Sequence, residues 1–367
     1  MKLLICCNHS FPHVGGAETV IQSIAEGLVS KWNWEVYVTS FTIPNPIRRN
    51  GVILLPCSQD YNQFLTTISS IRPDHVFIYG DVFKHLPEII RSPKSIDLPI
   101  SIALVGMNKI WWDDFLFDSF CKNKDSFNII VHSKEYFDYQ VCESQGFDVS
   151  VIPNGISLND FSDTGINFRN KYNFDDEELL LLCVANFFPE KGYEILSSVI
   201  ESISNNAQRK FRMCVIASSV NHPASISLEE KFRSDISDLS CTVLKNIRRE
   251  DVIAAFKSSD LFVFPSFKEV APIVLLESMA SSLPFVSFDV GNTEEYGHEA
   301  GIVVKRESLS PDDIYPTLND INKFSGVIID LMNDDIRRNK IGEKGRSIAE
   351  HRYDWNTILP LYHDIFN

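Results

Sequence analysis

The sequence has no long apolar run and no excess of basic residues. Its longest hydrophobic stretches, near residues 98–107 and 179–188, are about half of the roughly 20 residues that a membrane-spanning helix requires. Acidic residues outnumber basic residues by 49 to 34, which gives a formal net charge of −15. This balance opposes a broad contact with nucleic acid or with an anionic lipid surface. A local basic pocket for one diphosphate remains compatible with it, because net charge does not describe a single cleft.

Paired cysteines and metal-binding spacings are also lacking. The eight cysteines are scattered, mostly inside apolar runs, with no C-x-x-C and no paired Cys/His spacing. We expect them to be reduced core residues of a cytoplasmic protein. Residues 1–7 contain an apolar segment too short for the core of a signal peptide, and we expect a first β-strand there.

Short apolar runs alternate with segments of helical period along most of the chain. This alternation is typical of βαβ units on a parallel sheet and predicts an α/β fold, while a length of 367 residues predicts two domains. The predicted strands are 2–6, 35–40, 75–79, 100–104, 128–131 and 149–152, then 179–184, 212–217, 261–264 and 285–287. The predicted helices are 17–31, 61–70, 111–121 and 134–144, then 193–204, 250–258, 273–281, 320–332 and 334–351.

The two series are separated by a polar stretch at 157–176 that shows no periodicity, and we place the linker there. The predicted domains are therefore 1–165 and 166–351. The aromatic tail, about 352–367, has no obvious place in the second sheet and is expected to pack back on the first domain.

Two carboxylates follow the predicted strand 261–264. Glu269 and Glu277 are eight positions apart, and a helix beginning near Pro272 would place its N-terminus between them. That arrangement suits a nucleotide sugar, because the N–H groups receive phosphate and the carboxylates accept hydrogen bonds from hydroxyls. From the spacing alone a simpler interpretation is favoured, in which Glu269 is a first-turn acidic residue and Glu277 lies on a solvated helix face.

The surrounding sequence resembles the retaining GT-B glycosyltransferases of family 4, whose signature is E-x7-E. The similarity extends, in the family's order, over 260–266, 274–286 and 290–295. This resemblance implies two Rossmann-like domains that face each other across a deep cleft. It also implies that Glu269 binds hydroxyls of the donor sugar and that Glu277 binds the ribose hydroxyls. The backbone expected to meet phosphate or sugar is that of Ala271, Pro272, Ile273 and Val274.

Two further segments resemble motifs of this family. Gly15 and Gly16 lie between the first strand and the first helix, where glycine lets the backbone approach a ligand. A tight βα turn explains them more simply, but the resemblance implies that their N–H groups face the donor phosphate. Lys191 lies in the run N-F-F-P-E-K-G at 186–192, where the family has an Arg and a Lys that neutralise the leaving diphosphate.

Asn186 stands where the family has that Arg. A charge-assisted contact of about 1.5–3 kcal/mol is thereby replaced by a neutral bond of about 0.5–1.5 kcal/mol. Lys268, Arg248 and Arg249 are the candidate cations for compensation, although each is more often a solvated surface charge.

The N-terminal half also departs from the family. Many relatives carry a His close to the reacting sugar after the strand that corresponds to 100–104, whereas this chain has V-G-M-N at 105–108. Asn108 is a candidate in its place. His132, at another strand end, is the second acceptor-side candidate, with packing as its simpler role. The run W-W-D-D at 111–114 suggests a sugar platform or a metal site, but a buried helix start is the simpler explanation and no D-x-D pattern is present.

These features predict a retaining glycosyltransferase that requires no metal and no cofactor beyond its nucleotide-sugar donor. Family frequency favours a UDP-hexose such as UDP-glucose, with a glycan or glycolipid as the acceptor. Lys191 and Glu269 are the predicted catalytic residues, the first stabilising the leaving diphosphate and the second positioning the donor. No nucleophile is evident, so attack is expected from the face that the diphosphate leaves.

Three alternatives have different chemistry. A GT-B epimerase acting on a UDP-N-acetylhexosamine would share the nucleotide site and need no acceptor. A binding relative that has lost turnover is suggested by Asn186 and by the missing His. A dehydrogenase is disfavoured, because no G-x-G-x-x-G follows a strand with an acidic residue at the required distance. Nucleic acid is not an expected partner, a local patch of the first domain could still contact a membrane, and the sequence does not predict the oligomeric state.

Overall fold

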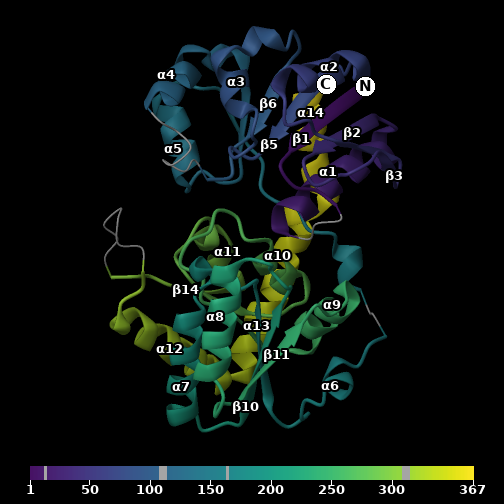
Figure 1. Cartoon of the computed structure of the whole chain (residues 1–367). Helices are drawn as coiled ribbons and strands as arrows, with labels where there is room; N and C mark the ends of the chain where they lie inside the picture. The colour runs from purple at the N-terminus through teal and green to yellow at the C-terminus, as the bar shows by residue number, and fades with distance from the viewer. Residues whose placement is uncertain (12–14, 107–113, 163–164, 308–314) are drawn as a thin grey trace. The chain divides into compact units, whose positions relative to one another are not determined.

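The computed structural model describes residues 1–11, 15–106, 114–162, 165–307 and 315–367. Its contacts divide the chain into two compact units, Met1–Gly155 together with Trp355–Asn367, and Ile156–Asp354 (Figure 1). The sequence prediction places the corresponding boundaries after residues 165 and 351. Each unit contains one sheet with helices on it, and the predicted α/β class with two parallel-sheet domains is confirmed.

The first unit is built on an eight-stranded sheet in the order β3-β4-β2-β1-β5-β6-β7-β8. All neighbouring strands are parallel except β3 and β4. The central strands β1, β5 and β6 are buried almost throughout, as expected for parallel strands covered by helices on both faces. The elements are β1 (Lys2–Cys7), α1 (Gly16–Trp32), β2 (Glu35–Ser40), β3 (Ile47–Arg49), β4 (Val52–Pro56), α2 (Tyr61–Ile71), β5 (His75–Tyr79), α3 (Leu86–Arg91), β6 (Ile100–Ala103), α4 (Asp114–Lys122), β7 (Asn128–Val131), α5 (Phe137–Ser144), β8 (Val149–Val151) and α14 (Trp355–Phe366).

The second unit is built on a six-stranded parallel sheet in the order β11-β10-β9-β12-β13-β14. Its first strand, β9, lies in the middle, so the chain adds strands on one side of β9 and then on the other. This is the strand order of a Rossmann fold. The elements are α6 (Phe168–Lys171), β9 (Leu179–Val184), α7 (Tyr193–Asn206), β10 (Phe211–Ala217), α8 (Pro223–Asp235), β11 (Cys241–Lys245), α9 (Arg249–Ser258), β12 (Leu261–Phe264), α10 (Ile273–Ala280), β13 (Phe285–Phe288), α11 (Thr293–Ala300), β14 (Gly301–Val304), α12 (Leu318–Met332) and α13 (Asp335–Ile348).

The C-terminal helix α14 belongs to the first unit, where it lies beside α1 (Figure 1). Its apolar side is buried, with Trp355 against Gly155 and Leu359 against Gly27. A Cβ at either glycine would overlap these side chains, so the glycines allow the helix to approach closely. Within the described residues, no helix is both long enough and apolar enough to cross a membrane.

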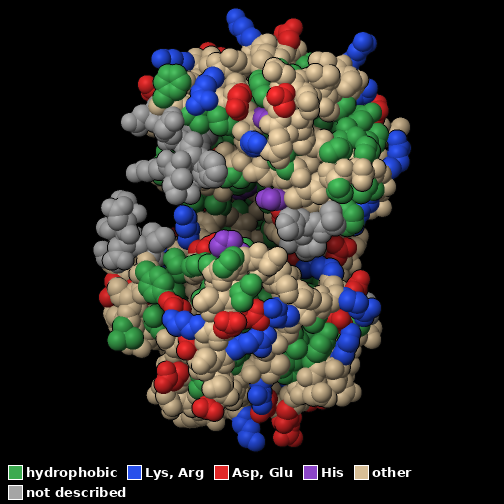
Figure 2. Space-filling view, in the orientation of Figure 1, with side chains coloured by type: hydrophobic (Ala, Val, Ile, Leu, Met, Phe, Trp, Pro, Cys, Tyr) green, Lys and Arg blue, Asp and Glu red, His purple; other side chains and the backbone are tan. Residues whose placement is uncertain are grey.

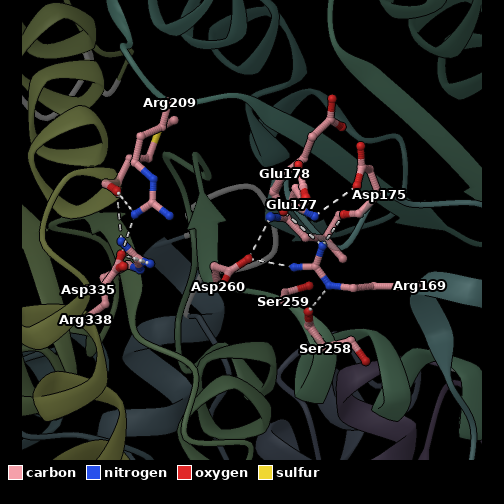
Figure 3. Close-up of polar contacts among 12 residues, drawn as sticks. Arg169, Asp175, Glu177, Glu178, Arg209, Ser258, Ser259, Asp260, Asp335 and Arg338 are labelled. Atoms are coloured by element: carbon pink, nitrogen blue, oxygen red, sulfur yellow. Dashed lines mark hydrogen bonds and ion pairs between the residues drawn. The ribbon is translucent and has the colours of Figure 1, made fainter.

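The polar stretch at 157–176 is not a free linker. It contains α6, and its aromatic residues Phe161, Phe168 and Phe174 are buried in the core of the second unit. Arg169 fixes it further, because its guanidinium donates to the carbonyls of Asp175, Glu178 and Ser258 and to the Asp260 carboxylate (Figure 3). Three widely spaced aromatic residues and one arginine produce no periodic pattern, so this contribution to the core of the second unit is not visible in the sequence.

The hairpin of β3 and β4 is also missing from the sequence prediction. Asn50 and Gly51 form its turn with φ values of 48° and 84°. An Asn-Gly pair is the usual signal of a two-residue hairpin, because both of its positions require positive φ. The signal is present in the sequence, but the flanking strands are short.

A buried histidine connects β5 to the C-terminal helix and predicts sensitivity to acid. His75 is 2% exposed, its Nε2 lies 2.9 Å from Ser101 Oγ, and its ring lies tilted against that of Phe366 in α14, with the centroids 5.1 Å apart. Burial lowers the pKa of His75 from its ordinary 6.5 to about 4, and a backbone hydrogen bond with Phe366 acts in the opposite direction. Between these pH values the unfolded chain binds a proton that the folded chain excludes.

The free energy of unfolding should therefore fall as the pH drops from about 6.5 toward 4, by about 2 kcal/mol at pH 5 from this one group. Urea denaturation of the wild type and of His75→Gln at pH 7 and pH 5 measures it. The variant should show a smaller loss, and the exposed His351→Gln should behave like the wild type. Equal losses in the wild type and His75→Gln would contradict the assignment.

Candidate active site

The candidate site lies at the carboxyl ends of β9 and β12, which are neighbours in the second sheet. The chain leaves these two strands toward opposite sides of the sheet. In open α/β sheets this switch point forms a crevice in which ligands bind. Lys191 follows β9 and Glu269 follows β12, so the topology brings together two residues that are 78 positions apart.

Lys191 and Glu269 form an ion pair. The Lys191 Nζ lies 2.6 Å from Glu269 Oε1, with side-chain exposures of 25% and 12%. Glu269 is therefore a partner of the other predicted catalytic residue rather than an isolated first-turn acid. An ammonium group has three donors, so this pairing leaves Lys191 able to donate to a phosphate oxygen as well.

The backbone on both sides of this ion pair depends on two glycines. Gly192 adopts φ 73° directly after Lys191, and a Cβ there would overlap the carbonyl of Pro265. Gly291, after β13, adopts φ 54° and lies against the carbonyl of Val270 in the same way. Only glycine combines the left-handed conformation with so close an approach. These contacts bring the loop that carries Glu269 against the loops that follow β9 and β13.

The helix α10 begins at Ile273, with Pro272 as its N-cap residue and no side-chain hydrogen bond at the cap. The first N–H groups of a helix lack intrahelical partners and attract anions. The predicted segment Ala271, Pro272, Ile273 and Val274 therefore forms the end of the helix beside Glu269.

Glu277 lies on the buried side of α10, not on a solvated face. It is 5% exposed, and its Oε1 lies 2.5 Å from Nη2 of Arg249, the first residue of α9. The Arg249 side chain is 45% exposed and covers the ring of Phe161 at 5.6 Å. A buried carboxylate that keeps an exposed partner can accept further hydrogen bonds from hydroxyl groups, because each carboxylate offers about four acceptor positions.

A second arginine, Arg306, connects the loops at the strand ends of this site through hydrogen bonds. Its side chain is 5% exposed and donates to the Asp289 carboxylate at 2.8 Å, to the Asp289 carbonyl at 2.7 Å and to the Phe267 carbonyl at 3.2 Å. The Phe267 N–H donates to the carbonyl of Glu190, next to Lys191. Arg306 thus connects the end of β14 with the loops after β13, β12 and β9.

The sequence analysis does not identify Arg306. Its signal is the short apolar run of β14, Gly301–Val304, followed by a basic pair. A four-residue strand next to a helix is difficult to separate from that helix by periodicity.

We expect Arg306→Lys to weaken binding of the predicted nucleotide-sugar donor about tenfold, because lysine keeps the charge but cannot make the same forked set of hydrogen bonds. Calorimetric titration of UDP, GDP and ADP measures this effect. The neighbouring Lys305, with a side chain that is 74% exposed, provides the control, and Lys305→Met should bind as the wild type does. Unchanged affinity in a folded Arg306→Lys would show that the hydrogen bonds of Arg306 do not position the site.

The structure also shows where Asn186 and the three candidate compensating cations lie. Asn186 Oδ1 accepts the Ser218 N–H at 2.9 Å, so this side chain joins the ends of β9 and β10. Arg249 pairs with Glu277, and Arg248 lies 3.5 Å from Asp251 at the start of α9. Lys268 is exposed beside Glu269.

The other predicted residues belong to the first unit. Gly15 is the N-cap of α1 and Gly16 is its first residue, so the helix begins one residue before its predicted start. His132 is 3% exposed, with Nδ1 2.9 Å from the Ile152 carbonyl and Nε2 3.3 Å from the Tyr79 hydroxyl. Burial lowers the pKa of His132. Its contacts favour packing over a direct contact with an acceptor.

Asn108 lies outside the described residues, as do positions 111–113 of the Trp-Asp run. Within the described ranges, no group of three or more His, Cys, Asp or Glu side chains could hold a metal ion. On the visible face of each unit, basic and acidic side chains are interspersed rather than gathered into a broad basic area (Figure 2).

Solved structures share this architecture. Sucrose-phosphate synthase from Thermosynechococcus elongatus superposes with a TM-score of 0.81 at 16% identity, covering 100% of this chain and 99% of that one. The Anabaena protein HepE, solved with UDP-glucose, superposes with a TM-score of 0.71 at 15% identity, covering 100% and 99%. The fold of the chain is therefore GT-B, the two-domain fold of a large class of glycosyltransferases.

Residues 166–348 match the family model described as glycosyl transferases group 1. Through this segment the chain is similar to the group 1 glycosyltransferases. Among curated proteins, it is 26% identical over 222 residues to the teichuronic acid biosynthesis glycosyltransferase TuaC of Bacillus subtilis, covering 59% of this chain and 53% of TuaC. It is 24% identical over 198 residues to a GDP-mannose-dependent phosphatidylinositol monomannoside mannosyltransferase of Corynebacterium glutamicum, covering 52% and 47%. The matches span about half the length of these relatives.

Proposed function

We propose that the protein is a retaining, metal-independent hexosyltransferase that uses a UDP-hexose, such as UDP-glucose, and a glycan or glycolipid acceptor. The observation that carries this proposal is the Lys191–Glu269 ion pair at the switch point of the second sheet. A cation and a carboxylate that share a hydrogen bond provide one group for a diphosphate and one for sugar hydroxyls.

In this proposal, different residues of the second unit bind different parts of the donor. Lys191 stabilises the charge that develops on the diphosphate as the anomeric bond breaks, and the N-terminus of α10 contributes its N–H groups. Glu269 orients the sugar by accepting hydrogen bonds, and Glu277 does the same for the ribose.

Retention of configuration follows from the proposed route. Lys191 already holds Glu269, so that carboxylate is assigned to positioning and not to a covalent intermediate. The acceptor hydroxyl then attacks the face that the diphosphate leaves and transfers its proton to a phosphate oxygen. NMR of the product tests this step, and an inverted anomeric configuration would contradict it.

Two donor bases, uracil and guanine, occur among the similar proteins. HepE was solved with UDP and UDP-glucose, whereas the Corynebacterium relative is named as GDP-mannose-dependent. We propose uracil rather than guanine, because HepE resembles this chain over its whole length and the Corynebacterium relative over about half of it. Direct titration distinguishes the two bases.

Calorimetric titration of UDP, GDP and ADP, with and without EDTA, tests the donor site. We expect micromolar binding of UDP that EDTA does not change. Glu277→Ala should weaken this binding at least tenfold, because it removes the buried carboxylate that accepts hydrogen bonds from the ribose. Glu299→Ala, on the exposed side of α11, is the matched control and should bind normally. Failure of the wild type to bind any of the three nucleotides would overturn the proposed function. UDP binding without transfer to any acceptor would favour a binding relative, and conversion of the donor without an acceptor would favour an epimerase.

A further inference from the structure

The first unit contains a pocket at its own switch point. The strands β1 and β5 are neighbours at the centre of the sheet, and the chain leaves them toward opposite sides (Figure 1). Asn8 and His9 follow β1, and residues 81–84 follow β5. Between them lies a pocket of about 320 Å³ that is formed entirely by residues of this unit.

The wall of the pocket is held in place by the side chain of Asn8. Its Nδ2 donates to the Val82 carbonyl at 2.6 Å, and its Oδ1 accepts the Lys84 N–H at 3.2 Å. The Asn8 carbonyl accepts the N–H of Phe41 at 3.2 Å. The three chain segments around the pocket are thus joined before any ligand binds, which reduces the ordering cost of binding.

The pocket combines an apolar wall with a few polar groups. Phe41 and Phe83 lie with their ring centroids 5.9 Å apart, and Val82, Leu86 and Pro87 extend this wall. Such a combination is typical of small-molecule sites, which occupy about 300–1,000 Å³. This pocket lies at the lower end of that range, which suits a sugar ring better than a whole nucleotide sugar.

Two opposite charges face the pocket. Asp81 is 6% exposed, and its Oδ1 accepts the Val105 N–H at 3.4 Å. Carboxylates accept hydrogen bonds from hydroxyl groups and donate none. Lys84 is exposed, and its ammonium donates to the amide oxygen of Gln59. Within the described part of the chain, no ion pair joins Lys84 to a carboxylate, so its charge is available to an anionic ligand.

We propose that this pocket binds one sugar ring of the acceptor, and that this sugar carries an anionic substituent. Ring hydroxyls donate to Asp81, an apolar face of the ring lies on Phe83, and a carboxylate or phosphate group contacts Lys84. This assignment rests on the proposed transferase function and names the class of its acceptor. It departs from the acceptor-side residues expected from the sequence, since His132 is buried away from this pocket's lining.

Ligand-observed NMR with the full chain in saturating UDP tests the assignment with three probes: methyl glucoside, glucuronate and glucose 6-phosphate. We expect at least one of the charged sugars to bind about tenfold more tightly than the neutral glucoside, because one charge-assisted contact is added. Lys84→Met should remove this difference. Lys94→Met, which replaces another exposed lysine of the same unit outside the pocket, should preserve it. Preference for glucuronate or for glucose 6-phosphate distinguishes a carboxylate from a phosphate.

Lys84 is exposed, so its replacement should not prevent folding, and Asp81→Asn should weaken binding of all three sugars. The proposal is overturned if the charged and neutral sugars bind equally, if Lys84→Met keeps the wild-type preference, or if no probe binds at millimolar concentration. UDP binding by the same samples distinguishes failure of the proposed acceptor site from failure of the proposed transferase function. Sugar selectivity can fail while UDP binding persists, in which case the transferase proposal stands without this acceptor site.

Discussion

Replacing Lys191 with methionine should lower the rate of sugar transfer by about 100- to 1,000-fold. This is the usual cost of removing one preorganised group that stabilises charge in a transition state. The change also leaves Glu269, 12% exposed, without its partner at 2.6 Å. Steady-state release of UDP from the proposed UDP-hexose donor measures the effect, with nucleotide affinity measured in parallel.

Lys268→Met is the matched control for this prediction. It removes the neighbouring cation, which is exposed and lies one residue from Glu269. We expect its rate to stay within a few-fold of the wild type, and Lys191→Arg to retain part of the activity because it preserves a positive charge. A larger loss in Lys268→Met than in Lys191→Met would contradict the prediction, because it would show that Lys268 stabilises the leaving group.

Replacing Arg169 with methionine should reduce the free energy of unfolding by about 3 kcal/mol, the cost of removing one member of a largely buried ion pair and hydrogen-bond network. Its side chain is 14% exposed and holds three carbonyls and the Asp260 carboxylate (Figure 3). Asp260 also accepts the Leu180 N–H at 2.8 Å, so the change loosens the start of β9. Urea denaturation provides the measurement.

Arg212→Met controls for the loss of an arginine from the same unit. Arg212 is 38% exposed and lies 3.6 Å from the Glu178 carboxylate, a distance and exposure at which an ion pair contributes little. Its replacement should change stability by less than about 0.5 kcal/mol. Comparable losses in the two variants would mean that the segment 157–176 is not held by Arg169.

Much of the fold was predictable because parallel strands and their helices have strong local patterns. Strands β2, β5 and β9 occupy the residues that the sequence predicts, and β9 is a continuous apolar run. The short strands β11 and β14 and the helices α8 and α11 were missed. They are brief or weakly amphipathic, and they depend on packing in the second unit more than on their own sequence.

The candidate site was predictable only in part. The sequence marks Lys191, Glu269 and Glu277 through motifs, and local chemistry explains why a helix begins after Pro272. It could not decide whether Glu277 is solvated or buried, because the pattern of α10 is apolar on almost every side. It also could not reveal Arg306, whose partners lie 17 and 39 positions away.

The sequence by itself therefore determined the class of the fold, the absence of a membrane-length apolar run and the residue types at the site, since these depend on composition, periodicity and short spacing. Only the tertiary structure decided which charges meet. The pairs Lys191–Glu269 and Arg249–Glu277 are created by strand order, which places the ends of distant segments side by side. The same holds for the pocket of the first unit, whose Asn8 and Lys84 become neighbours only because β1 pairs with β5.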